Sequence, residues 1–160
     1  MKKLKMEFKP KWSEIEQVRE NVESFLNKTG VISDMHPSIL MVSNELVENA
    51  VKYGSQNPDD EINLVIGHEK GVFKIEVKSH MNEFDDYNLA ELDHMIQWIR
   101  GHQNPMEAYI EKLNKVASID INHQGSGLGL VRLSYEGRSL VDFYLDENGR
   151  ICVSAEIVLE

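Results

Sequence analysis

The chain has 160 residues, a length typical of one globular domain with its own hydrophobic core. Its formal net charge of −10 argues against nucleic-acid binding, because phosphate neutralisation needs clustered Lys and Arg. The single cysteine excludes an internal disulfide and a zinc site built from several thiolates. No apolar run predicts a membrane span or a signal peptide, so we expect a cytoplasmic protein.

The first eleven residues hold five lysines, and we interpret them as a solvated, frayed terminus with a short edge strand over 6–11 that Pro10 stops. Ser13 and Glu16 have the spacing of a capping box. The helix that follows is predicted from apolar residues at helical spacing, namely Ile15, Val18, Val22, Phe25 and Leu26. Gly30 should end this helix.

A second helix is predicted over 37–53, with Gly54 as its end. One side of it is formed by Ile39, Val42, Leu46, Ala50 and Tyr53. The other side is formed by Met41, Glu45, Glu48, Asn49 and Lys52. Taken alone, this second side is typical of an ordinary solvated helix surface.

Residues 55–60 predict a loop, and the apolar alternation over 62–77 predicts a β-hairpin whose turn is bracketed by Gly67 and Gly71. Two more helices are expected, over 88–99 and from 105 to about 117. In them, Trp98 and Tyr109 are candidates for a partner interface, although packing between the two helices is the favoured interpretation.

The chain should end in a second hairpin that turns through Asn148-Gly149, and Cys152 in its alternating strand is expected to be a buried, unreactive thiol. Two hairpins imply antiparallel pairing, and one-sided alternation requires helices on one face only. The predicted fold class is therefore a two-layer α+β sandwich with a mostly antiparallel sheet. Residues 1–160 should form a single domain.

A candidate phosphate-binding loop has glycine at every second position: Gly125, Ser126, Gly127, Leu128 and Gly129. Glycine lets the backbone approach a ligand closely, so that successive N–H groups can surround an anion. A Walker loop would require Gly-Lys-Ser/Thr, which is absent here. A dinucleotide-binding loop would require a parallel sheet, against which the hairpins argue. As a bare pattern, alternating glycines also fit a flexible turn.

Glu45 and Asn49 lie one helical turn apart and point the same way on the predicted helix over 37–53. An Asn oxygen is a hard ligand that suits magnesium, and a nearby Glu can accept a proton from a hydroxyl group or water. Lys52 is placed to contact a phosphate as a point charge. These groups supply what phosphoryl transfer from ATP requires beyond the glycine loop.

At these two segments the chain resembles the GHKL ATPases, the superfamily that includes gyrase-type ATPases, histidine kinases and anti-sigma-factor serine kinases. The segment from Glu45 to Gly54 is similar to their N box, and Gly125-Ser126-Gly127-Leu128-Gly129-Leu130 is similar to their second glycine box. The element order is similar to their Bergerat fold. The inserted helices and final hairpin look closest to SiaB-like regulatory kinases, which act on a small partner protein.

The resemblance implies that ATP and Mg²⁺ are cofactors, that Glu45 is a general base and that Asn49 is the metal ligand. It also exposes a departure at the first glycine box, where the family has Asp-x-Gly-x-Gly. This chain has Ser79, Met81 and Glu83 in place of the aspartate and the two glycines. An unpaired adenine amine would weaken binding by about 1–3 kcal/mol, and Asn82 is a substitute acceptor or an ordinary loop residue.

Two functions therefore remain open. The first is a small protein kinase that transfers the ATP γ-phosphoryl group to a Ser or Thr of a regulatory partner, as in partner-switching signal transduction. The second is a non-catalytic module of the same fold that binds a protein and has lost nucleotide binding. Both functions predict a protein partner, and neither conflicts with a homodimer.

Overall fold

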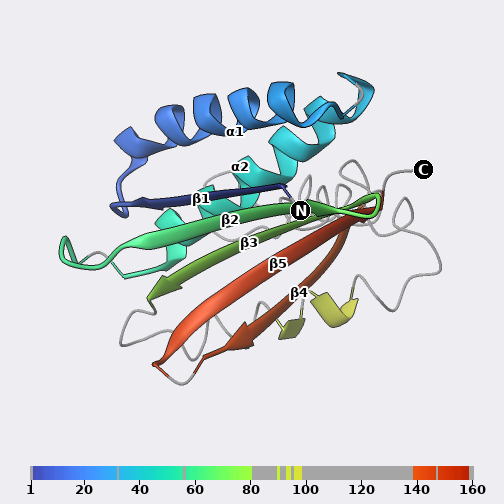
Figure 1. The fold of residues 1–160 in the computed structure, drawn as a ribbon. Helices are drawn as coiled ribbons and strands as arrows, with labels where there is room; N and C mark the ends of the chain where they lie inside the picture. The colour runs from blue at the N-terminus through green and yellow to red at the C-terminus, as the bar shows by residue number, and fades with distance from the viewer. Residues whose placement is uncertain are drawn as a thin grey trace, which may run out of the picture.

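The structure, a computed structural model, is a two-layer α+β sandwich (Figure 1). It describes residues 2–31, 33–55, 57–80, 139–146 and 148–158, together with 90, 93, 94 and 96–98. The strands are β1 (Lys2–Phe8), β2 (Ile62–Glu69), β3 (Val72–His80), β4 (Ser139–Leu145) and β5 (Arg150–Val158). The helices are α1 (Ile15–Thr29) and α2 (His36–Tyr53), and the short 3-10 helices Trp12–Glu14 and Ser33–Met35 precede them.

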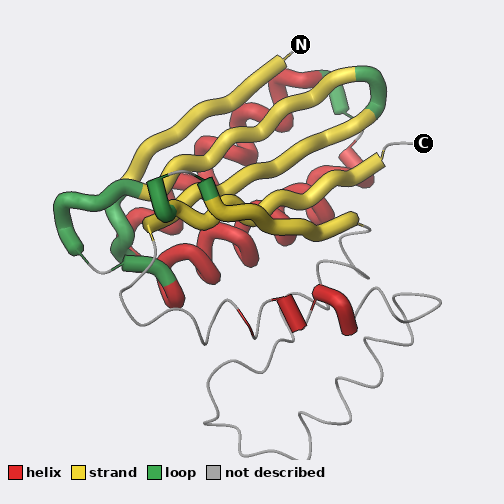
Figure 2. The backbone as a smooth tube through the Cα atoms, turned by 90° about the horizontal axis from the view of Figure 1, so that it is seen from below, coloured by secondary structure: helices red, strands yellow, loops and turns green. Residues whose placement is uncertain are grey.

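The five described strands form one sheet in the order β1-β2-β3-β5-β4, and every neighbouring pair is antiparallel. Both long helices cover the same face of this sheet, as the view from below shows (Figure 2). The predicted fold class, an antiparallel sheet with helices packed on one face, is confirmed by this arrangement.

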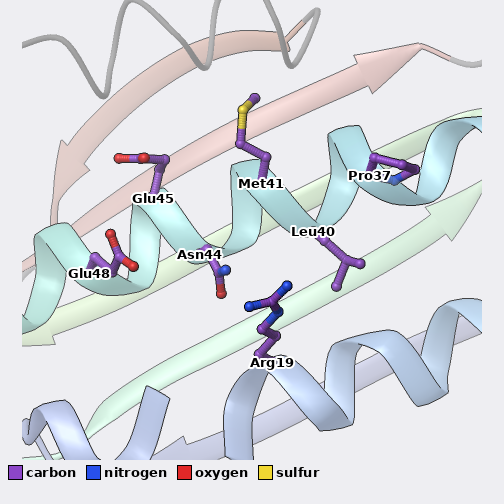
Figure 3. Close-up of a pocket in the computed structure, with 7 residues that line it drawn as sticks. All are labelled: Arg19, Pro37, Leu40, Met41, Asn44, Glu45 and Glu48. Carbon is purple, nitrogen blue, oxygen red and sulfur yellow. The ribbon is translucent and has the colours of Figure 1, made fainter. Parts of the chain in front are cut away.

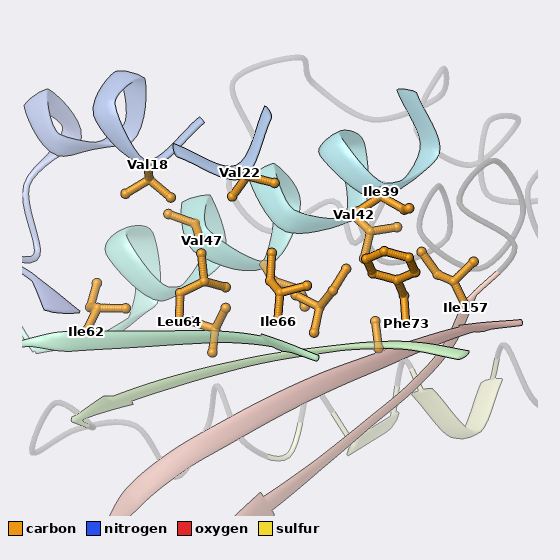
Figure 4. Close-up of a cluster of buried hydrophobic side chains, with 14 of the residues drawn as sticks. Val18, Val22, Ile39, Val42, Val47, Ile62, Leu64, Ile66, Phe73 and Ile157 are labelled. Carbon is orange, nitrogen blue, oxygen red and sulfur yellow. The ribbon is translucent and has the colours of Figure 1, made fainter. Parts of the chain in front are cut away.

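The core lies between the sheet and α2, with α1 packed alongside (Figure 4). Its largest fully buried side chain is Phe73, which stands among residues of both helices and of the alternating strands. The apolar side predicted for α2 is correct for Ile39, Val42 and Leu46. Val47 and Val51 are buried as well, because α1 covers a second flank of α2. Trp98 packs against this core, and neighbouring Ile96 belongs to it. The predicted packing of Trp98 between the helices over 88–99 and 105–117 involves residues outside the described part of the chain.

The lysine-rich start is not frayed, so that prediction is wrong. Lys2 to Phe8 pair along the whole length of β2, and the strand ends before Pro10 rather than at residue 11. Lys3 and Lys5 are exposed on this edge strand, where charge discourages pairing with other chains. The predicted edge strand over 6–11 overlaps the second half of β1, and its lysine-rich first half was missed because its partner lies some sixty residues further along the chain.

Two local details also differ from the predictions. The capping box is not formed, because Ser13 lies inside a 3-10 helix and the N-cap residue of α1, Glu14, makes no side-chain capping hydrogen bond. The turn between β2 and β3 consists of Lys70 and Gly71, both with positive φ, while Gly67 lies inside β2. Two consecutive residues with positive φ make the tight hairpin whose twist matches the strands.

Gly30 ends α1 in the left-handed conformation with φ of 76°, as predicted. The final hairpin is also confirmed, since Gly149 has a positive φ in the β4–β5 turn. Asp146 organises this turn by accepting backbone N–H groups of Asn148 and Arg150. The Arg150 N–H, assisted by the Asn148 N–H and by the Arg150 side chain, lowers the pKa of the Asp146 carboxyl below its ordinary value.

Cys152 is buried, as predicted, but it lies on the sheet face away from the helices. It pairs in register with Lys78 on one side and Tyr144 on the other. Burial raises the pKa of its thiol, and the hydrogen bond between the two side chains raises the pKa of Tyr144 to about 12. The hydrogen bond with Tyr144 by itself lowers the pKa of the thiol, but burial has the larger effect, so the sulfur stays protonated at neutral pH and is a poor nucleophile.

We therefore expect Cys152 to resist alkylation by iodoacetamide in the native protein at mildly alkaline pH and to react rapidly in urea. If reaction must wait for unfolding, the native rate should be lower by about 10³ or more. Mass spectrometry of a labelling time course measures both rates. Equal rates in the two conditions would show that the thiol is accessible in the native protein.

Candidate functional site

The candidate site is built on the flank of α2 that faces away from α1. Glu45 and Asn49 are separated by one turn of this helix, roughly 6 Å along its axis, and both are half-buried. Lys52, in the last turn, is exposed. In the close-up, the Glu45 side chain extends to the side of α2 opposite Arg19, which comes from α1 (Figure 3). A carboxylate and a carboxamide thus share one partly covered flank.

The end of α2 is fastened to the end of β3. The backbone N–H of Ser55 donates to the His80 carbonyl at 2.8 Å, and the Gly54 N–H donates to the Ala50 carbonyl at 3.0 Å. A Cβ added at Gly54 would lie 2.5 Å from the Ala50 oxygen and 3.3 Å from the His80 oxygen. This glycine is therefore required by close backbone approach rather than by a left-handed conformation.

This junction brings together two segments that were compared with the GHKL ATPases, the end of the N-box-like helix and the position of the first glycine box. The last turn of α2 carries Lys52, and the strand end beside it carries Ser79. Ser79 alternates with Phe73, Ile75 and Val77, so its side chain faces the helices, and it is buried. The residue at the position of the family's adenine-binding aspartate is therefore a small buried hydroxyl group.

Sequence reasoning missed a surface hollow between α1 and α2, with a volume of about 480 Å³ (Figure 3). Its lining residues are Arg19, Pro37, Leu40, Met41, Asn44, Glu45 and Glu48. Of the predicted site residues that the structure describes, only Glu45 lines it. Periodicity could not predict this hollow because it depends on how two helices lie side by side.

The remaining predicted site residues fall outside the described part of the chain: Asn82, Gly125, Ser126, Gly127, Leu128 and Gly129. Met81, Glu83 and Tyr109 also fall outside it. That the glycine loop faces the Glu45–Asn49 flank therefore stays a prediction. Among the described residues, no group of three or more His, Cys, Asp or Glu side chains is placed to hold a metal ion.

The donor set can be compared with the cofactors that the resemblance implies. The amide of Asn49 is half-buried on its flank, and an amide oxygen suits a single inner-sphere bond to Mg²⁺ that keeps its other ligands from water and phosphate. This end of the site fits a magnesium-bound phosphate. The Ser79 end lacks a carboxylate for the adenine amine and fits the base poorly.

No family model matches the chain, and no curated protein matches it. None of the helices in the described ranges is long and apolar enough to cross a membrane. The fold is similar to a chain in the crystal structure of the SiaB-SiaC complex from Pseudomonas aeruginosa, with a TM-score of 0.64 and 17% identity. The match covers 98% of this chain and 89% of that one, so the two chains share a fold over nearly their whole length.

Proposed function

We propose that this chain is a small regulatory protein of the GHKL ATPase superfamily that binds Mg-ATP and phosphorylates a Ser or Thr of a partner protein. The observation that carries the proposal is the shared α2 flank of Glu45 and Asn49, fastened through Gly54 to the end of β3. The fold similarity supports it, because the similar chain comes from a complex of two proteins.

Each described residue has one role in this proposal. Asn49 would hold Mg²⁺, which neutralises charge on the phosphates when it is bound. Glu45 accepts the proton of the attacking hydroxyl group, so that the oxygen can bond to the γ-phosphorus as ADP leaves. Lys52 supplies a positive charge near the phosphates. A half-buried carboxylate suits this role, because partial burial strengthens its contact with the hydroxyl proton.

The second candidate is a non-catalytic module that binds a partner without nucleotide. The observation that favours it is Ser79, which is buried at the position of the adenine-binding aspartate. A missing carboxylate there leaves the adenine amine unpaired, at a cost of about 1–3 kcal/mol. This cost lowers affinity by roughly ten- to a hundredfold, which a cell with millimolar ATP can tolerate.

Thermal unfolding with and without Mg-ADP or Mg-ATP separates the two candidates. At a hundredfold excess over the dissociation constant, bound nucleotide should stabilise the protein by about 2.7 kcal/mol and raise the melting temperature visibly. Asn49→Asp should remove most of this shift, because a carboxylate at that point repels the phosphates. Asn44→Asp is the matched control, since Asn44 lies on the same helix toward Arg19 (Figure 3).

No shift at millimolar nucleotide would overturn the kinase proposal and favour the non-catalytic module. If Asn49→Asp and Asn44→Asp reduced the nucleotide-dependent melting shift equally, any added negative charge on α2 would weaken nucleotide binding. Asn49 would then have no specific role.

A further inference from the structure

One buried hydroxyl group on the helix-facing side of the sheet lacks a hydrogen-bond partner among the described residues. The buried polar residues in this part of the chain are Thr29, Ser43, Ser79 and Ser139. The hydroxyl groups of Thr29 and Ser43 each donate to a carbonyl oxygen of their own helix at 2.8 Å, and Ser139 also has a partner. Ser79 has an exposed fraction of only 4%, yet no other described residue hydrogen-bonds its hydroxyl group.

The Ser79 hydroxyl group is not sealed inside the core. In the ranges that the structure describes, the one polar side-chain atom that is both unpartnered and closed off from solvent is Asn63 Oδ1, on the outer face of the sheet. The Ser79 oxygen therefore keeps an opening. Buried polar side chains are nearly always hydrogen-bonded in native proteins, so an unpaired hydroxyl group at an opening marks a place for a ligand atom or a water molecule.

Ser79 lies at the end of β3 that is fastened to α2. The carbonyl of the next residue, His80, accepts the Ser55 N–H at 2.8 Å, directly after the last turn of the helix. Under the proposed function, on which this inference rests, the phosphates of the nucleotide lie at Asn49 and Lys52 of the same helix. The base is then the part of the nucleotide that reaches Ser79.

A hydroxyl group at this point cannot select one purine base. Adenine presents an amine donor where guanine presents a carbonyl acceptor. A carboxylate can only accept, whereas a hydroxyl group donates or accepts according to its rotation. The serine side chain is also short, and a water molecule that bridges it to the base can turn either way. We infer that the site binds guanine nucleotides as well as adenine nucleotides, and that Ser79 is the residue responsible for this relaxed specificity.

Isothermal titration calorimetry of the full chain with Mg-ADP and Mg-GDP tests this inference. We expect the two dissociation constants of the wild type to agree within about threefold, because the hydroxyl group serves both bases alike. Ser79→Asp should make the site prefer Mg-ADP by about tenfold or more. In that variant the adenine amine gains an acceptor, while the guanine carbonyl faces a carboxylate without a donor between them.

Ser79→Asn is the matched variant, because asparagine has the shape of aspartate but its amide can both donate and accept. Its two dissociation constants should stay within about threefold of each other. This variant also keeps the test decisive if circular dichroism shows that the buried carboxylate of Ser79→Asp prevents folding. Ser24→Asp controls for added charge, since Ser24 is exposed on α1, and it should change neither constant.

A wild-type chain that binds Mg-ADP at least tenfold more tightly than Mg-GDP would overturn this inference and leave the proposed function standing. Equal binding of the two nucleotides by a folded Ser79→Asp protein would also overturn it, because Ser79 would then not face the base. So would a Ser79→Asn protein that prefers one nucleotide by tenfold. A wild-type chain that binds neither nucleotide would overturn the proposed function itself, and this inference with it.

Discussion

Replacing Glu45 with glutamine should lower the rate of phosphoryl transfer by roughly 10²- to 10⁴-fold while nucleotide binding is retained. Glutamine keeps the size and hydrogen-bonding reach of the side chain, but it cannot take the proton of an attacking hydroxyl group. Transfer is measured with γ-labelled ATP, both to proteins captured from cell extract by the immobilised chain and to water as free phosphate. The Mg-ADP melting shift of the variant reports its binding in the same preparation.

Glu48→Gln is the matched control for this experiment. Glu48 lies three residues further along α2, is half-buried like Glu45, and lines the same hollow (Figure 3). Its side chain is about 100° around the helix axis from Asn49 and has no role in the proposed transfer, so its neutralisation should leave the transfer rate within about twofold. A Glu45→Gln protein with an unchanged transfer rate would rule out Glu45 as the base. A protein that loses the melting shift as well would show that Glu45 acts in binding.

Gly54→Ala should destabilise the protein by about 1–3 kcal/mol, because the added Cβ would overlap one backbone oxygen and crowd a second, and neither can rotate away. One oxygen belongs to Ala50 in the last turns of α2, and the other belongs to His80 at the end of β3. To relieve the overlap, the backbone at residue 54 must move away from the Ala50 carbonyl, which strains the hydrogen bond between the Gly54 N–H and that carbonyl and the neighbouring link to His80. The change should therefore also reduce any nucleotide-dependent melting shift by displacing the last turns of α2.

Urea unfolding measures this effect, with Gly67→Ala as the control. A Cβ at Gly67 meets nothing within 4 Å, and Gly67 lies inside β2, where alanine is readily accommodated. Its free energy of unfolding should stay within about 0.5 kcal/mol of the wild type. Equal unfolding midpoints for the two variants would mean that α2 and β3 can separate freely at this point. The site would then lack the rigid junction on which its geometry depends.

Local patterns predicted those parts of the fold that neighbouring residues decide. The helical period of α1 and α2, the left-handed Gly30 and the Asn148-Gly149 hairpin each depend on residues only a few positions apart. The alternation in β2, β3 and β5 was visible for the same reason. The two-layer architecture followed, because a sheet with one apolar face must be covered by helices.

For the candidate site, the sequence alone placed Glu45 and Asn49 on one helix flank, because residues four apart share a face of any α-helix. Only the tertiary structure decided that α1 covers the other flank, that Gly54 holds α2 against β3, and that the edge strand extends back to Lys2. These features arise where backbone segments distant along the chain meet. The stability of these features depends on close backbone approach and on pairing between distant segments. The local periodicity of apolar residues carries no information about either.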